Sequence, residues 1–256
     1  MNYIYLVFGG IKVKFEKIIF IFCLFFSFNN LMANKPVVQL AQSLSLVDFY
    51  DAIRKGDFEK VKKIVEADKS IVNKAEEKQE LVSECSCGIV LYTPLYIAIS
   101  NDKDDIAKYF IDNGANLEAT SAPEKMTSLH CACKKRNLDM VEYLVEKGAS
   151  VHTERGGPIA FLHDRKAYGT PLFYAVDSPE IITFLISKGA DPNVESVLNY
   201  TPLTFAATDG DIASVKALVQ GGADPQKGYA LNQAKHNHYP NVVQYLENEI
   251  AKRSQK

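Results

Sequence analysis

Two Cys-x-Cys pairs carry the most chemistry in this chain: Cys85 with Cys87, and Cys131 with Cys133. Such pairs can form disulfides or bind a soft metal ion through thiolates. Cys131 and Cys133 fall in a segment with helical spacing, where side chains two residues apart diverge by about 200°. They therefore do not readily share one ion or bridge each other. Three interpretations stay open: two small buried thiols, a bridge from Cys85 or Cys87 to Cys131 in preference to Cys133, and a metal site.

Histidines are the second group with possible chemistry. His236 and His238 are spaced like a pair of metal ligands, but they fall where two helices should be joined by a turn, so we expect solvated side chains. The chain contains no nucleophile elbow, no zinc-protease helix motif, no phosphate loop and no dinucleotide fingerprint. We expect no catalytic residue, no cofactor and no bound metal, and therefore a protein that is not an enzyme.

One sequence motif recurs four times, and the helices that it predicts are the elements that position these residues. It begins at Thr93, Thr127, Thr170 and Thr201 and in three cases reads Thr-Pro-Leu. A threonine can cap a helix whose first turn holds proline, because proline loses no needed N–H there. An alanine recurs five residues after each threonine, where it lets two helices approach closely: Ala98, Ala132, Ala175 and Ala206. A glycine then ends each second helix: Gly114, Gly148, Gly189 and Gly222.

These residues, at a spacing near 33, resemble the ankyrin repeat over Ser45 to Glu249. The resemblance implies an all-α solenoid of five to six helix-turn-helix repeats joined by β-turn fingers, with atypical repeats at both ends. His130 is the histidine of the family's Thr-Pro-Leu-His motif, for which the resemblance implies a structural role. Tyr96, Phe173 and Thr204 replace it in the other repeats, which also favours packing over chemistry.

The spacing departs from the family pattern at two fingers and one turn. Insertions lie between Val151 and Tyr168 and between Asn73 and Tyr92, and the turn at Asp177 to Glu180 is shortened. Insertions in a solenoid occur where the stack tolerates them, which is often the binding edge. The expected organisation is a signal peptide at 1–33, a linker at 34–44, the repeat domain at 45–250 and a charged tail at 251–256.

Residues 1–33 differ in composition from the rest. Lys12, Lys14 and Lys17 precede an apolar run from Ile18 to Phe28, and Leu31-Met32-Ala33 offers a cleavage site. This pattern is typical of a secretory signal peptide. The run is shorter than the roughly 20 residues of a membrane span, although an uncleaved anchor stays open. We expect a periplasmic or secreted bacterial protein that meets a membrane only through this segment.

We expect the protein to function by binding through its surface, because the repeats account for nearly all of the chain after Ser45. The formal net charge is −2, and no basic stripe suggests nucleic acid. We expect a monomer that binds a protein partner. Three roles stay open for it: an immunity protein that neutralises a secreted toxin, an accessory factor for a periplasmic or peroxide-defence enzyme, and an effector that acts on a host protein. A redox- or metal-responsive protein using the Cys-x-Cys pairs is the other alternative.

The resemblance places partner contacts on a concave face made of the fingers and the first helices. Rigid aromatic side chains suit such contacts. The expected binding residues are Tyr92, Ser100, Asn101, Met126, Lys134, Lys135, Arg155, Phe161, Tyr168, Tyr200, Thr208 and Asp209.

Overall fold

The computed structural model describes residues 5–8, 11–14, 46–82, 86–121, 125–154, 169–196 and 199–255, with backbone alone for 5–14 and 77–90. The chain divides into two units, Met1–Phe49 and Tyr50–Lys256. In the first unit, β1 (Tyr5–Phe8) and β2 (Ile11–Lys14) pair as an antiparallel hairpin. The expected apolar run of the leader lies outside the described residues. Within the described ranges, no helix has the length and apolar character needed to cross a membrane.

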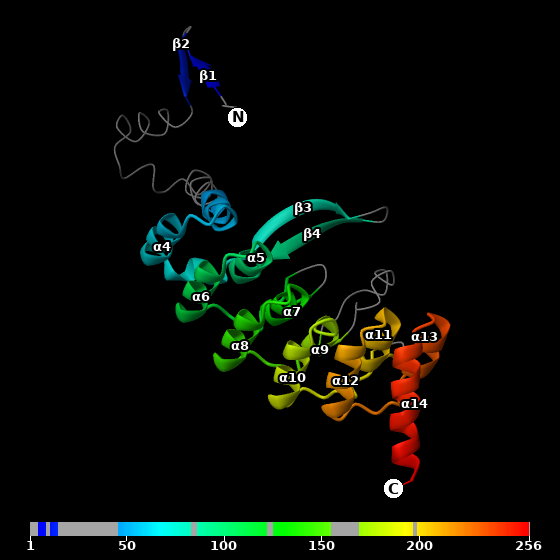
Figure 1. Cartoon of the computed structure of the whole chain (residues 1–256). Helices are drawn as coiled ribbons and strands as arrows, with labels where there is room; N and C mark the ends of the chain where they lie inside the picture. Colours follow the sequence, from blue (N-terminus) through cyan, green and yellow to red (C-terminus); the bar gives the residue numbers. More distant parts are fainter. Residues whose placement is uncertain are drawn as a thin grey trace. The chain divides into compact units, whose positions relative to one another are not determined.

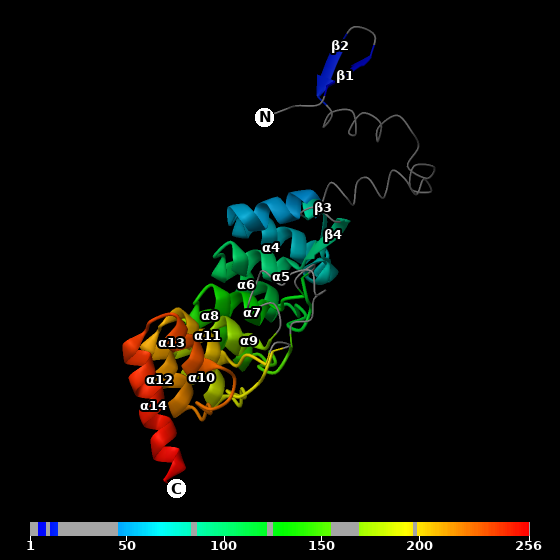
Figure 2. The same cartoon turned by 90° about the vertical axis from the view of Figure 1, so that its right-hand side faces the viewer.

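The second unit is a stack of helix pairs, as Figure 1 shows. Residues 50–55 are helical and precede α4 (Phe58–Ala67) and the short 3₁₀ helix η1 (Lys69–Asn73). The following pairs are α5 (Pro94–Ser100) with α6 (Asp104–Asp112), α7 (Ser128–Lys134) with α8 (Leu138–Glu146), α9 (Pro171–Tyr174) with α10 (Pro179–Ser187), α11 (Pro202–Asp209) with α12 (Ile212–Gln220), and α13 (Ala230–His236) with α14 (Pro240–Ser254). The two views show these pairs stacked in chain order (Figures 1 and 2), which confirms the predicted all-α solenoid.

Among the described residues of this unit, strands lie only in the first finger. There β3 (Glu76–Val82) and β4 (Ser86–Tyr92) form an antiparallel hairpin that extends away from α5 (Figure 1). This hairpin is the insertion that the spacing between Asn73 and Tyr92 indicated. The second insertion, at 155–168, lies outside the described residues.

Threonine caps start three of the four recurring first helices. The hydroxyl oxygens of Thr93, Thr127 and Thr201 accept a hydrogen bond from the backbone N–H three residues later. Thr170 makes no such bond, so the expectation that it caps its helix is wrong. Its helix, α9, is only four residues long, since the turn that follows it is shortened, and it offers little helix to cap.

Glycine ends the second helices as predicted. Gly114, Gly148, Gly189 and Gly222 have φ values of 85°, 100°, 95° and 100°, in the left-handed region that glycine adopts without a steric penalty. The four recurring alanines are fully buried between the helices of each pair. Large apolar side chains such as Phe110, Leu144 and Leu185 complete a core that runs along the stack.

Ser128 is a local defect in the pattern. It occupies the position where the other three copies of the motif carry proline, and its buried hydroxyl has no hydrogen-bond partner among the described residues. Thr127, the preceding residue, already has the extended backbone that proline requires of its neighbour, with φ −79° and ψ 169°.

We therefore expect Ser128→Pro to raise the free energy of unfolding by about 1 kcal/mol, since it removes an orphaned hydroxyl and restricts the unfolded chain. Urea unfolding followed by circular dichroism measures this change. The reverse substitution Pro202→Ser is the matched control and should lower stability. A Ser128→Pro variant less stable than the parent would contradict the assignment of this position as a first helical turn without a needed N–H.

Three polar side chains hold neighbouring fingers together; two of them, Asn193 and Glu118, lie four residues after a helix-ending glycine, and the third, Asn73, lies at the end of η1. Asn193 donates to the carbonyl of Gly222 at 3.0 Å and accepts from the N–H of Asp224 at 2.7 Å. Asn73 makes the same two bonds to Gly114 and Asn116, at 3.0 and 2.7 Å. Glu118 accepts from the N–H of Ser150 at 2.8 Å in the equivalent position. We call these three side chains the finger clamps.

Asn193→Ala removes both bonds of one clamp and should lower the free energy of unfolding by about 2 kcal/mol. Asn193→Asp is the matched variant: it keeps the acceptor for Asp224 and loses only the donor, so its effect should be smaller. Denaturant titration of the three proteins tests this order. Equal stability of the alanine variant and the parent would show that the clamp bonds are replaced by water at no cost.

The C-terminal boundary differs from the sequence prediction. Residues 251–254 are not a tail but the last turn of α14, which continues to Ser254. The Arg253 guanidinium donates to the carbonyl of Ala223 at 2.9 Å and lies 3.5 Å from the Asp224 carboxylate. Arg253 thus closes the last finger from the end of α14. Composition alone suggested a tail because Lys252 and Arg253 are charged, but here those charges serve the end of the stack.

Candidate protein-binding surface

The first helices of the pairs form one row of the stack and the second helices form the other (Figure 1). We define the inner face as α5, α7, α9, α11, α13 and the described parts of the fingers. Every described residue of the predicted binding set belongs to this face or to the turns at its edge. Arg155, Phe161 and Tyr168 lie outside the described residues, so their predicted roles remain predictions.

The start of the inner face is held mainly by local contacts. Tyr92 stacks on Tyr96 with ring centroids 5.7 Å apart. At the end of α5, the Ser100 hydroxyl and the Asn101 amide both donate to the carbonyl of Ile97, at 3.0 and 2.8 Å. Tyr92 and Ser100 are half-buried, and Asn101 is exposed. These side chains are accessible, but their hydrogen bonds serve the helix end.

Lys134 is the last residue of α7 and Lys135 follows it, and of the two side chains only that of Lys135 bonds to a neighbouring repeat among the described residues. The ammonium of Lys135 donates to the carbonyl of Ser100 at 3.1 Å and lies 2.8 Å from the carboxylate of Asp102. One residue on, Arg136 pairs with Asp177 at 2.6 Å. Lys135 therefore joins two repeats, which adds a stacking role to the predicted partner contact.

Met126 is placed differently from the prediction. It is 0% exposed and its carbonyl accepts from the N–H of Ser121 at 2.9 Å, which closes the second finger. A side chain with no solvent-exposed surface cannot contact a partner, so the assignment of Met126 as a binding residue is wrong. The reason is chemical, because a long apolar side chain at this position gains more from the core than tyrosine, whose hydroxyl needs water or a partner.

A groove of about 470 Å³ lies between α11 and α13 on the inner face. It is lined by Tyr200, Thr204, Phe205, Thr208, Gln233, His236 and Asn237. Tyr200 and Thr208 belong to the predicted set, and Asp209, also predicted and exposed, follows Thr208 at the end of α11. We call this depression the inner groove.

The ring of Tyr200 forms one wall of the inner groove. It meets Phe205 nearly edge-on at 5.9 Å and Tyr229 edge-on at 6.2 Å. Edge-to-face pairs hold aromatic rings in fixed orientations. Tyr229 is 55% exposed, one of the two large apolar side chains that are exposed among the described residues.

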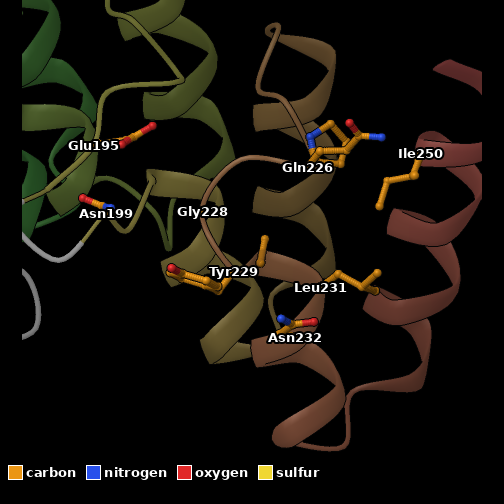
Figure 3. Close-up of a pocket in the computed structure, with 10 residues that line it drawn as sticks. Glu195, Asn199, Gln226, Gly228, Tyr229, Leu231, Asn232 and Ile250 are labelled. Atoms are coloured by element: carbon orange, nitrogen blue, oxygen red, sulfur yellow. The ribbon is translucent and has the colours of Figure 1, made fainter. Parts of the chain in front are cut away.

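A second depression of about 510 Å³ lies on the finger side of Tyr229, and we call it the finger groove. Figure 3 shows Tyr229 between Asn199, from the preceding finger, and Leu231, from the start of α13. The remaining lining includes Glu195, Gln226, Asn232 and Ile250. Glu195 is paired with Lys227 at 3.1 Å, so its charge is compensated. Tyr229 thus lines the finger groove and packs against Tyr200, which lines the inner groove.

Sequence reasoning missed Tyr229, Phe205, Gln233 and His236. A signal was present, because the match of Ala234 to Ala206 places His236 at the position of Thr208 and Asn237 at that of Asp209. Applying the predicted binding positions to the last repeat would have selected both. Tyr229 takes the place of the capping threonine Thr201, and nothing in the sequence marks its exposure.

The cysteines of α7 are inert in the structure. Cys131 and Cys133 are both free and buried, so the predicted bridge from the first finger to Cys131 is not formed, and the interpretation as two small buried thiols fits. Burial raises the pKa of the Cys131 thiol to about 12 and raises that of Cys133 further. A protonated thiol is a poor nucleophile and metal ligand. Cys85 lies outside the described residues, and the Cys87 side chain is not described.

His130 is buried and holds two repeats together. Its Nδ1 accepts from the backbone N–H of Thr127 at 3.3 Å and lies 2.7 Å from the Thr127 hydroxyl, while its Nε2 lies 3.2 Å from the carbonyl of Gly169. This pattern fits the tautomer with the proton on Nε2. The ring also packs edge-on against Tyr174 at 5.4 Å. All these contacts are structural. Among the described residues, no three His, Cys, Asp or Glu side chains are arranged to hold a metal ion.

The family is shown by comparison with known proteins. The model of ankyrin repeats in three copies matches residues 49–155 and 172–255, so this chain belongs to the ankyrin-repeat family. Ankyrin repeats form protein–protein interaction modules and are typically non-enzymatic. The finger residues 156–171, which include most of the second insertion, fall outside the match.

Individual relatives cover parts of the chain. The transient receptor potential channel pyrexia of Drosophila melanogaster is 32% identical over 120 residues, 46% of this chain and 11% of its own length. An ankyrin repeat protein of Rickettsia felis is 31% identical over 146 residues, 50% of this chain and 37% of its own. Human palmitoyltransferase ZDHHC13 is 28% identical over 223 residues, 76% of this chain and 34% of its own. The chain thus spans little more than a third of these relatives at most.

Proposed function

We propose that this chain is an exported, non-enzymatic protein that binds a protein partner through its inner face, with the main contacts at the last two repeats. The observation that carries the proposal is the exposed ring of Tyr229, which lines the finger groove and packs against Tyr200 of the inner groove. Exposed aromatic anchors beside depressions are the side chains that contribute most to protein interfaces. The described part of the chain offers no competing cluster of catalytic groups, since its buried cysteines and His130 are tied into packing.

The inner face is the better candidate because the outer aromatic side chains are already covered. On the outer helices, Tyr143 donates to Asp112 at 2.8 Å, and the ammonium groups of Lys108 and Lys147 lie 5.5 and 5.1 Å from the centre of its ring. Tyr229 lacks any such cation over its ring among the described residues. An aromatic ring without a cover gains more from a partner than one that already has contacts.

Site-specific photo-crosslinking tests the binding face. A photoreactive phenylalanine analogue is placed at Tyr200 or Tyr229 on the inner face and at Tyr143 or Tyr245 on the outer helices, in the organism that makes the protein. We expect a discrete adduct from the inner positions alone. Adducts from the outer positions alone would place the partner on the other face, and no adduct from any position would contradict the binding function.

Export is proposed on the sequence pattern of residues 1–33. Cell fractionation followed by N-terminal sequencing should give a protein that starts near Asn34 in the periplasm or the medium. A protein with intact Met1 in the cytosol would contradict export. It would leave the binding face untouched, since that face is formed by residues after Tyr50.

A further inference from the structure

The inner groove has one aromatic wall of fixed orientation. Tyr200 is held nearly perpendicular to Phe205, at 87°, and to Tyr229, at 90°. A ring buttressed from two sides keeps one face and one edge available to a ligand without the cost of ordering a mobile side chain. The wall is suited to flat contact with apolar rings or methylene groups.

The opposite wall carries polar groups from α13. The side chains of Gln233 and His236 form no hydrogen bond to another described residue, so both can reach a ligand. Between them and the aromatic wall, the Thr208 hydroxyl donates to the carbonyl of Thr204 at 2.8 Å, and the Asn237 amide donates to the carbonyl of Thr208 at 3.0 Å. The Asn237 bond links the end of α13 to α11, so it holds the two walls of the groove together before any ligand binds.

Among the residues that the structure describes, charge is nearly absent from both grooves. None of the described carboxylates or ammonium groups lines the inner groove, and the one described carboxylate of the finger groove, Glu195, is compensated by Lys227. A strongly acidic or basic segment would lose its hydration without gaining a partner charge. Charge complementarity therefore favours an uncharged ligand segment.

The described walls are α11, α13 and the end of a finger at Tyr200, and none of them is a strand, so this part of the chain offers the groove no strand edge for backbone pairing. Helix α13 is seven residues long and spans about 10 Å, which corresponds to three or four residues of a polyproline II segment at about 3.1 Å each. That conformation needs no ladder partner, leaves its carbonyls free to accept from side chains, and packs its rings on aromatic walls. Gln233 is the donor that such carbonyls require.

We infer that the inner groove, together with the ridge at Tyr229, binds an uncharged, proline-containing extended segment of the partner protein. Proline rings pack on Tyr200 and Tyr229, and the backbone carbonyls of the segment accept from Gln233. This inference rests on the proposed function and specifies which part of the partner the inner face recognises.

Selection from a phage-displayed library of random dodecapeptides on the purified protein tests the inference. We expect enriched peptides that contain proline and lack charged residues at the centre. Fluorescence anisotropy with one enriched peptide should then show about a tenfold or larger loss of affinity when its prolines are replaced by alanine. Enrichment of acidic or basic peptides, of peptides without proline, or of no sequence at all would overturn the inference.

Alanine substitutions test whether the peptide binds at the inner groove. Tyr229→Ala and Gln233→Ala should each weaken binding of the enriched peptide, by about tenfold for the tyrosine. Tyr245→Ala, on the outer face of α14, is the matched control and should leave the affinity unchanged. Circular dichroism confirms that each variant is folded, and Gln233→Ala carries the test if Tyr229→Ala is not. Unchanged affinity in the folded inner-face variants would overturn the inference. Photo-crosslinking at Tyr229 to a partner that lacks such a segment would do so as well, while leaving the binding function intact.

Discussion

Replacing both buried thiols by alanine is expected to protect the fold against alkaline pH. Between pH 7.5 and pH 10.5, the parent should lose about 4 kcal/mol more of its free energy of unfolding than the double variant Cys131→Ala/Cys133→Ala. The cavities left by alanine cost the variant stability at every pH, so this cost cancels when each protein is compared with itself. The tyrosines and lysines that ionise in the same range are common to both proteins.

The expected sign follows from the direction of the pKa shifts. Burial raises the pKa of Cys131 from 9.0 to about 12 and raises that of Cys133 as well, because a thiolate in the core would be poorly solvated. Below pH 9 both states hold the proton and the thiols contribute no pH dependence. Above pH 9 the unfolded chain releases the proton first, so each thiol lowers stability by about 1.4 kcal/mol per pH unit.

Urea titrations under reducing conditions at the two pH values measure this difference. A matched pair of single variants should each recover about half of the effect, since the two thiols are screened by different parts of the core. Equal alkaline losses in the parent and the double variant would show that the thiols are not protonated groups of the folded core, and would revive a covalent role for Cys131.

Most of the fold could be predicted because many helix boundaries are marked by one residue with a strong local preference. Proline opens α5, α9, α10, α11 and α14, and glycine with positive φ follows the ends of α6, α8 and α10. These preferences act within one turn of the chain and need no knowledge of the neighbours. Thr170 failed as a cap because the length of α9 depends on the shortened turn that follows it, which no local preference records.

The candidate site was harder to predict because exposure and pairing depend on neighbouring repeats. The position before each capping threonine holds Met126 in one repeat and Tyr200 in another, and only the structure shows that the first is buried and the second lines a groove. In the sequence, Lys135 looks like an unpaired surface lysine, but in the structure its ammonium group forms an ion pair with Asp102 of the preceding repeat. The finger clamps were also missed, although two of them, Asn193 and Glu118, lie four residues after a helix-ending glycine in the sequence.

His130→Ala should be the most destabilising single substitution considered for this fold, with a loss of about 4 kcal/mol of the free energy of unfolding. The imidazole is fully buried, so its removal leaves a cavity against Tyr174, which costs about 2 kcal/mol or more for a side chain of this size. It also leaves the Thr127 N–H without its acceptor and the Gly169 carbonyl without its donor. Unpaired polar groups in the core add about 1 kcal/mol or more each when water cannot replace the partner.

The equivalent residue of a later repeat supplies the control. Thr204 occupies the same position and makes the same reciprocal cap with Thr201, but its side chain is small. Thr204→Ala should therefore cost about 1 kcal/mol, the usual value of a helix cap. Because the Nε2 of His130 reaches Gly169 in the next repeat, its loss should also uncouple the two halves of the stack, so amide exchange should become faster in α7 to α10 than in α11 to α14. If the two variants lose similar amounts of unfolding free energy and amide exchange is uniform along the stack, His130 acts only as a helix cap and does not join the repeats.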